Sequence, residues 1–343
     1  MNNTSQAIHK LQTNERLLWD IFLGGFGHNL LLIAHDIKLF SLLANQPLTA
    51  VGVAKALNIQ IRPTNALLTF CTSVGILSFN DNYYSLTLVA EEYLLESSPT
   101  YFGAFLELNI ANNSTLSFEK LKNAVLTNSS QVYDNGKLFQ SHEEEVKLAK
   151  AFTHAMHGHS MGAALAWSSS IDLSKYQVLL DIGGGSGAHA IAAALKWSNL
   201  QSIVLDMPPV CEVAKEYIAS YGLQSRVKTY VSNMWDNPFP VADIHFYADI
   251  YHDWPPEKGR FLTQKSFDTL ESGGSIMIHE MLYNDEKTGP VTVANYNTAM
   301  LLWTEGQQYS ALEISTMLSE VGFNNIEIKP TFGYWSIVTA CKP

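Results

Sequence analysis

The chain has 343 residues, a length that suggests two domains at about 100–200 residues each. Hydrophobic residues make up 47% of the chain and charged residues 15%, which is typical of a globular protein and excludes a disordered one. Acidic residues outnumber basic ones by 32 to 21, and the net charge is −11. That charge argues against nucleic acid as a partner, because Lys and Arg must neutralise the phosphates, and it is compatible with a small neutral or cationic ligand.

Neither the cysteines nor the apolar segments indicate export or a membrane. Cys71, Cys211 and Cys341 show no disulfide or metal spacing, and a reducing cytoplasm is the simplest interpretation. The N-terminus lacks a basic start followed by an apolar run, so no signal peptide is expected. Residues 21–33 come nearest to a membrane span, but glycines and polar residues interrupt them, so no span is expected.

The first half of the chain, residues 14–170, is predicted to be mostly helical. Three helices and two short strands are expected in turn, at residues 36–44, 50–57, 65–74, 76–79 and 83–88. This order is typical of a winged helix, a scaffold that DNA-binding regulators also use. The third helix carries no Lys or Arg after Arg62, so it lacks the groups of a recognition helix and better suits a core or a dimer interface.

The second half alternates strands with helices. Strands are expected at residues 177–182, 201–206, 226–232, 243–250 and 275–280, with helices at 188–195, 210–221 and 256–270. The alternation predicts a parallel, doubly wound α/β sheet, and two β-rich runs at 325–329 and 334–341 predict a terminal hairpin with an antiparallel strand. The expected domains are a helical, winged-helix-like domain, residues 1–170, and an α/β domain, residues 171–343.

A glycine-rich loop is the strongest local signal. It lies between a predicted strand and a helix and reads Asp181-Ile182-Gly183-Gly184-Gly185-Ser186-Gly187. Glycines let a ligand approach the backbone closely, and ligands of open α/β sheets bind at the carboxyl ends of the strands, where this loop lies. Asp206 ends the next strand, where its carboxylate can accept hydrogen bonds from ribose hydroxyls. Together these features predict a ligand that contains a nucleoside.

The loop alone leaves two cofactors open. Gly183, Gly185 and Ala188 also fit the NAD fingerprint. The carboxylate of Asp181 would repel a pyrophosphate but suits the cationic amino acid part of S-adenosylmethionine (SAM). The position of the loop behind a long helical domain also favours SAM over NAD.

Four segments together carry a resemblance to a known family. They are residues 152–160, the glycine loop, residues 205–208 (Leu-Asp-Met-Pro) and His252-Asp253-Trp254. In this order, and with the winged-helix region, nearly the whole chain resembles class I SAM-dependent O-methyltransferases of the caffeate and hydroxyindole type and their bacterial relatives. The resemblance implies a Rossmann-like SAM-binding domain, an N-terminal domain that forms a homodimer and caps the substrate, and methylation of a hydroxyl on a small aromatic secondary metabolite.

The resemblance implies that His252 is the general base and that Glu280 orients it. A hydroxyl attacks a methyl sulfonium poorly until its proton leaves, and an imidazole with a pKa of about 6.5 can accept that proton near neutral pH. The predicted strand 243–250 would bring His252 to the carboxyl edge of the sheet. Glu280 ends the next strand and is expected at the same edge.

The other expected site residues fall into two groups. The residues expected to hold SAM are Ser160, Asp181, Gly183, Gly185, Asp206, Met207, Asn233 and Met234. The residues expected to line the acceptor pocket are Phe152, Met156, Trp235, Tyr251, Asn297, Met300 and Trp303. No metal is expected, because the histidines of residues 154–159 have no carboxylate nearby in sequence.

Two positions depart from the family pattern. Asn233 stands where the family has an aspartate beside the adenine, although its amide oxygen can still accept a hydrogen bond. Gln308 stands where relatives carry a second glutamate near the base, and it cannot act as an anion, so Glu280 is expected to be the sole supporting carboxylate. This change leaves open C- or N-methylation and a SAM-assisted reaction without methyl transfer. A winged-helix regulator with a vestigial cofactor domain is a third alternative, but it would not need a base.

Overall fold

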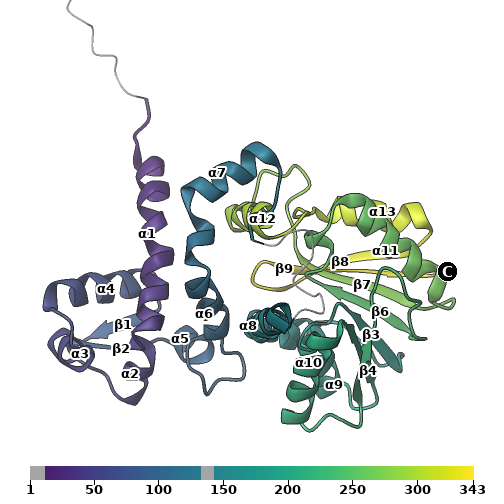
Figure 1. The fold of residues 1–343 in the computed structure, drawn as a ribbon, viewed down its shortest axis with the longest axis horizontal. Coiled ribbons are helices and arrows are strands. Elements are labelled where there is room, and N and C mark those ends of the chain that lie inside the picture. The colour runs from purple at the N-terminus through teal and green to yellow at the C-terminus, as the bar shows by residue number, and fades with distance from the viewer. Residues whose placement is uncertain (1–11, 133–142) are drawn as a thin grey trace, which may run out of the picture. The chain divides into compact units, whose positions relative to one another are not determined.

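The computed structural model describes residues 12–132 and 143–343, with side chains from residue 146 in the second range (Figure 1). The chain forms two compact units, Met1–Ser98 and Pro99–Pro343. The boundary expected from the sequence was residue 170, where the helical pattern gives way to strands. The helices between these two positions are part of the second unit: α6 (Gly103–Ala111), α7 (Phe118–Thr127) and α8 (Glu143–Ser170).

The first unit has the expected order of a winged helix. Its elements are α1 (Arg16–Asp36), α2 (Leu39–Asn45), α3 (Ala50–Leu57), α4 (Ile61–Ser73), β1 (Leu77–Asn80), β2 (Tyr83–Leu86) and α5 (Leu88–Tyr93). Thr49 caps α3 by accepting the backbone N–H of Gly52 at 3.1 Å. Helix α4 starts before the expected residue 65, since Pro63 lies in its first turn, where a missing N–H costs nothing. The two strands pair antiparallel, with Leu77 opposite Leu86.

Helix α1 keeps much of its apolar surface exposed. It is long and apolar enough, by length and composition alone, to cross a membrane, and only 11% of its most apolar window is buried. No membrane span was expected from the sequence, because the glycines, His28 and Asn29 interrupt the apolar run at residues 21–33. These residues do not lower the mean hydropathy of α1 below the level that a membrane span requires. The core helices of soluble proteins and signal sequences meet the same requirement.

The second unit contains one seven-stranded sheet in the order β5-β4-β3-β6-β7-β9-β8. Its strands are β3 (Val178–Ile182), β4 (Gln201–Asp206), β5 (Val227–Val231), β6 (Ile244–Ala248), β7 (Ser275–Met281), β8 (Asn324–Phe332) and β9 (Trp335–Cys341). The first five strands in this order are parallel, and β9 runs antiparallel between β7 and β8. The predicted doubly wound sheet and terminal hairpin are therefore confirmed.

Helices cover both faces of this sheet (Figure 1). Because side chains alternate along a strand, Leu180 of β3 packs with α11 (Pro256–Thr269) and α13 (Ala311–Val321) on one face, whereas Leu179 packs against Trp167 of α8 on the other. Helices α9 (Ala188–Lys196) and α10 (Pro208–Ser220) pack together with α8. The order of the strands reverses beside β3, and in such sheets the crevice at the carboxyl ends of these strands is the usual ligand site.

Candidate active site

Three glycines after β3 adopt a backbone that other residues rarely reach. Gly183, Gly185 and Gly187 have φ values of +66°, +57° and +77°. A Cβ on Gly183 would lie 2.5 Å from the Ile250 side chain, and one on Gly184 would lie 2.7 Å from the carboxyl carbon of Asp181. Gly185 faces open space on the cavity side, with no heavy atom within 4 Å of its Cβ position. The loop thus leaves room for a ligand and for the Asp181 carboxylate at once.

The carboxylate of Asp206 is fixed at the end of β4. Its two oxygens accept the backbone N–H groups of Gly185 at 2.9 Å and Met207 at 2.7 Å. Burial raises its pKa to about 6, although both hydrogen bonds oppose the shift. A carboxylate held this way borders the cavity and can accept further hydrogen bonds from hydroxyl groups.

Asp181 is almost fully buried at the end of β3. Burial raises its pKa to about 7, and Asp206 adds to this shift, while the N–H of Ala190 at 3.2 Å opposes it. The Oδ1 atom of Asp181 has no hydrogen-bond partner among the described residues, although this side chain borders the cavity. A buried carboxylate with an unpaired oxygen suits a cationic group such as the ammonium of SAM.

A cavity of about 610 Å³ opens at the carboxyl ends of β3, β4 and β6. Its volume is within the range of small-molecule sites. The expected residues that line it are Phe152, Met156, Ser160, Asp181, Gly183, Gly185, Asp206, Met207, Asn233, Met234, Trp235, His252, Met300 and Trp303. The expected cofactor residues and most expected acceptor residues are therefore brought to one place.

Three expected site residues do not line the cavity. The Tyr251 side chain points into the core, where its hydroxyl hydrogen-bonds with Thr263 at 2.9 Å. Asn297 accepts the backbone N–H of Gln308 at 2.7 Å and so fixes the loop after α12 (Val291–Trp303). Glu280 lies behind His252, as the position of an orienting residue requires.

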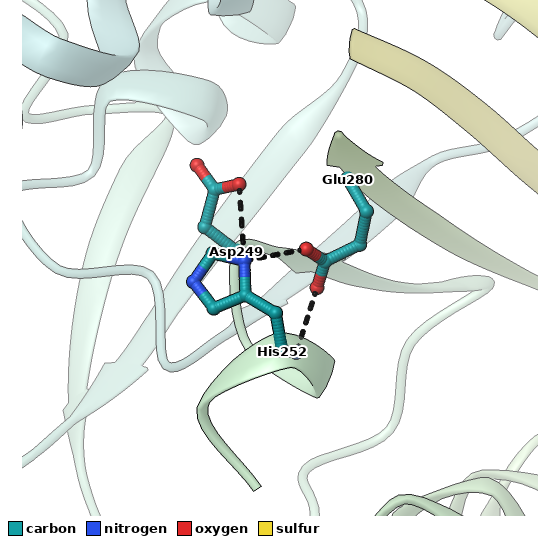
Figure 2. A group of neighbouring side chains, drawn as sticks. All are labelled: Asp249, His252 and Glu280. Atoms are coloured by element: carbon teal, nitrogen blue, oxygen red, sulfur yellow. Dashed lines mark hydrogen bonds and ion pairs between the residues drawn. The ribbon is translucent and has the colours of Figure 1, made fainter. Parts of the chain in front are cut away.

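His252 and Glu280 form a buried pair (Figure 2). His252 lies in a short 3-10 helix, η3 (Tyr251–Asp253), which follows β6. Its Nδ1 is 2.8 Å from Oε2 of Glu280, and the other carboxylate oxygen of Glu280 accepts the backbone N–H groups of Tyr251 at 2.9 Å and His252 at 3.3 Å. Both side chains are nearly inaccessible, so the pair is preorganised.

The charges around His252 favour its protonated form. Burial alone would lower the pKa of this histidine, but Glu280, followed by Asp253 and Asp249, outweighs burial and raises the pKa above its ordinary 6.5. Asp253 lies 3.5 Å from Nε2, and Asp249 lies 3.8 Å from Nδ1. The expectation that Glu280 would be the sole supporting carboxylate is therefore wrong. Asp249 and Asp253 could not be identified as partners because their approach to the imidazole depends on the turn after β6.

Other residues that line the cavity were also missed. Phe105 and Leu108 of α6 border it, as does Tyr296 of α12, whose ring centre is 5.4 Å from that of His252. The apolar residues of α6 look like ordinary core residues in the sequence. Tyr296 had a usable signal, because it is one helical turn before the expected Met300.

The two departures from the family pattern have different structural outcomes. The amide oxygen of Asn233 accepts the N–H of Trp235 at 2.9 Å, and its Nδ2 donates to Asp236 at 2.8 Å, so this side chain is engaged in its own turn. Gln308 is buried, and neither amide atom has a hydrogen-bond partner in the described part of the chain.

Within the described ranges, possible metal ligands come together at one place. Single ligand atoms of Asp249, His252 and Glu280 all lie within 4.8 Å of one another. The ion pairs of His252 with Glu280 and Asp249 also bring these ligand atoms close together without an ion. That no metal takes part stays a prediction.

The chain matches two family models that together span most of its length. The O-methyltransferase domain matches residues 118–324, and the O-methyltransferase dimerisation domain matches residues 19–96. The sheet, the glycine loop and the two domain matches define a SAM-dependent methyltransferase. The chain belongs to the O-methyltransferase family, and the NAD and regulator alternatives no longer apply.

Individual relatives cover nearly the whole chain. A 3-hydroxy-5-methyl-1-naphthoate 3-O-methyltransferase of Streptomyces sahachiroi is 32% identical over 90% of each chain. An L-tyrosine C(3)-methyltransferase of Streptomyces lavendulae is 29% identical over 90% of this chain and 87% of its own. The crystal structure of human N-acetylserotonin methyltransferase in complex with SAM has a TM-score of 0.82 and 25% identity, covering 97% of this chain and 99% of that one.

Proposed function

We propose that this enzyme methylates a hydroxyl of a small aromatic acceptor and that His252 is the general base. The observation that carries the proposal is the buried pair of His252 and Glu280 at the wall of the cavity. Glu280 occupies Nδ1, which leaves Nε2 to receive the acceptor proton. The acceptor oxygen then forms a bond to the methyl carbon while the carbon–sulfur bond breaks and its electron pair stays on sulfur.

SAM supplies the electrophilic methyl group, and the residues around the glycine loop fit it. We infer that Asp181 holds the ammonium and Ser160 the carboxylate of the amino acid part. Asp206 would accept the ribose hydroxyls, with Met207, Gly183 and Gly185 along the nucleoside, and Met234 and Asn233 beside the adenine. Because Oδ1 of Asn233 already accepts the N–H of Trp235, its hold on the adenine is weaker than that of a free carboxylate.

The lining of the cavity supports an uncharged acceptor. Phe152, Met156, Met300 and Trp303 supply apolar surface for a flat ring. Among the described residues that line the cavity there is no Lys or Arg, whereas Asp249, Asp253 and Glu305 are acidic. Apart from His252, the described lining offers no cationic side chain to an acceptor with a free carboxylate.

The first test is binding followed by turnover. Calorimetric titration with SAM and with NAD should show binding of SAM alone. The chain is then incubated with methyl-labelled SAM and a panel of phenols, naphthols and hydroxyindoles. His252→Ala should lose roughly 10²- to 10⁴-fold in rate, the usual contribution of a general base. A variant that keeps the parent rate would show that positioning alone drives the reaction.

The acceptor charge has its own test. A hydroxynaphthoic acid is compared with its methyl ester, which differs only in the charge. We expect a higher kcat/KM for the ester, because the acidic cavity repels the free carboxylate. A preference for the acid would overturn the proposal of an uncharged acceptor.

C-methylation is the second candidate, because a relative 29% identical is named for methylation of a ring carbon of tyrosine. The same base would remove the phenol proton, and the electron-rich ring carbon next to the oxygen would bond to the methyl carbon as the carbon–sulfur bond breaks. The proton on that ring carbon then leaves, which restores the aromatic phenol. Carbon NMR of the product distinguishes the two outcomes, since an O-methyl and an aryl methyl carbon resonate far apart.

We further propose that the enzyme is a homodimer in the cytoplasm. The dimerisation-domain match begins within α1, at residue 19, and Leu17, Leu18 and Phe22 of this helix are each about two-thirds exposed in the single chain. Such an apolar surface indicates an interaction site. Cys71, Cys211 and Cys341 are free thiols, which supports a reducing compartment.

A further inference from the structure

Asp249 has an unusual backbone conformation next to the base. It follows β6 directly and has a φ of +53°, in the left-handed region that residues with a Cβ seldom occupy. Its carboxylate is buried and borders the cavity. Strain of this kind persists only where the surroundings enforce it, often at functional sites.

Contacts from separate elements fix the Asp249 carboxylate. Oδ1 accepts the indole N–H of Trp335, the first residue of β9, at 3.2 Å. Nδ1 of His252 lies 3.8 Å from the same oxygen, and Nδ1 of His159 on α8 lies 3.8 Å from Oδ2. Burial, with a smaller effect of His252, lowers the pKa of His159 to about 4, so His159 is neutral and adds no positive charge.

Gln308 is an uncharged amide, so it supplies no charge to His252 and Asp249. It is buried with both amide atoms unpaired among the described residues, and it stands where the family resemblance places a glutamate. The charged groups that face His252 are Glu280 from β7, Asp253 from η3 and Asp249 from the turn after β6. Neutral His159 from α8 and the Tyr296 phenol from α12 complete its surroundings.

We propose that Asp249 is a positioning residue that gives His252 a second negative charge on its Nδ1 side. The inference rests on His252 acting as the base. Burial raises the pKa of Asp249 to about 7, so its charge is present above neutral pH and stabilises the imidazolium that forms when His252 accepts the acceptor proton. Glu280 and Asp249 then hold the imidazole from one side and leave Nε2 to the acceptor.

The test titrates the His252 imidazole by NMR in histidine-labelled, EDTA-treated protein, with the signal assigned by its loss in His252→Ala. In Asp249→Asn the pKa of His252 should fall by about one unit, because an opposite charge at this distance has been removed. Asp249→Ser removes the same charge with a smaller side chain and should give the same shift.

Asp243→Asn is the matched control. Asp243 accepts the backbone N–H groups of Gln177 at 2.7 Å and Val178 at 2.8 Å, remote from the base, so this variant should lose stability and leave the His252 titration in place. An unmoved His252 titration in folded Asp249→Asn and Asp249→Ser overturns the inference.

A kinetic readout separates this inference from the proposed function. With 2-naphthol as acceptor, the acid limb of kcat should move to lower pH in Asp249→Asn by the same amount as the NMR titration, with KM for SAM unchanged. Full activity in His252→Ala would refute the base itself. Loss of activity in His252→Ala with an unmoved limb in Asp249→Asn refutes only the role of Asp249.

Discussion

Two aspartates beside the glycine loop retain a proton at a higher pH than ordinary carboxyl groups. Burial raises the pKa of Asp181 to about 7 and that of Asp206 to about 6. A bound cation favours the ionised form of a nearby carboxylate and lowers its pKa. Binding of SAM should therefore release protons wherever these groups are still protonated.

The affinity for SAM should thus be constant above about pH 7 and fall as the pH is lowered below the pKa of Asp181. Asp181→Asn should weaken SAM binding at pH 8 by roughly tenfold. It should also remove the fall in SAM affinity that begins near pH 7, because that fall reports the protonation of Asp181. Calorimetry at pH 6.5 in two buffers of different ionisation enthalpy measures the released protons. Asp243→Asn should bind SAM like the parent, and proton release that persists in Asp181→Asn would assign the effect to another group.

At the scale of single side chains, the sequence located the site but not all of its members. Asp181, Asp206 and His252 were predictable because each ends a strand or follows one directly. Asp249 also follows a strand, but its role depends on Trp335, which is 86 residues away in sequence and reaches it through the antiparallel strand β9. Contacts of this kind come from tertiary packing and leave no local pattern.

At the scale of elements, the spacing of the apolar residues and the residues typical of turns predicted most of the fold. The five parallel strands read as short apolar runs between helices, and the terminal hairpin as two β-rich segments. Helix α12 was not predicted, although three residues on it were expected in the pocket. Its apolar residues are spread around the helix, because one face lines the cavity while other side chains are buried in the protein, so no amphipathic period is visible.

The packing of α8 on the sheet gives a prediction about stability. Trp167 is fully buried, stacks on Phe246 at a centroid distance of 4.4 Å, and donates its indole N–H to His189 of α9 at 2.8 Å. Trp167→Ala should lower the free energy of unfolding by about 3–5 kcal/mol, since it leaves a cavity. Urea denaturation measures the change. Leu195→Ala, on the exposed face of α9, is the control and should change stability by at most about 0.5 kcal/mol. A similar small loss for Trp167→Ala would mean that α8 is held by other contacts.

At the scale of the whole molecule, the main unexplained surface is that of α1. Its exposed apolar residues include Leu17, Leu18, Trp19, Ile21, Phe22 and Leu23. An apolar surface of this kind marks an interaction site, and the dimerisation-domain match over residues 19–96 supports a second copy of the chain as its partner. The same helix also passes a test of length and composition for a membrane span.

Charged substitutions on α1 distinguish these two roles. If α1 joins two chains, the parent should sediment as a dimer at micromolar concentration without detergent, and Leu18→Glu with Phe22→Glu should give a monomer, because burying two carboxylates in an apolar interface costs several kcal/mol. Val241→Glu is the control, since Val241 is 82% exposed in the second unit and should leave the dimer intact. A parent chain that is monomeric in buffer would refute the dimer. A parent chain that stays in solution only with detergent would assign α1 to a membrane instead.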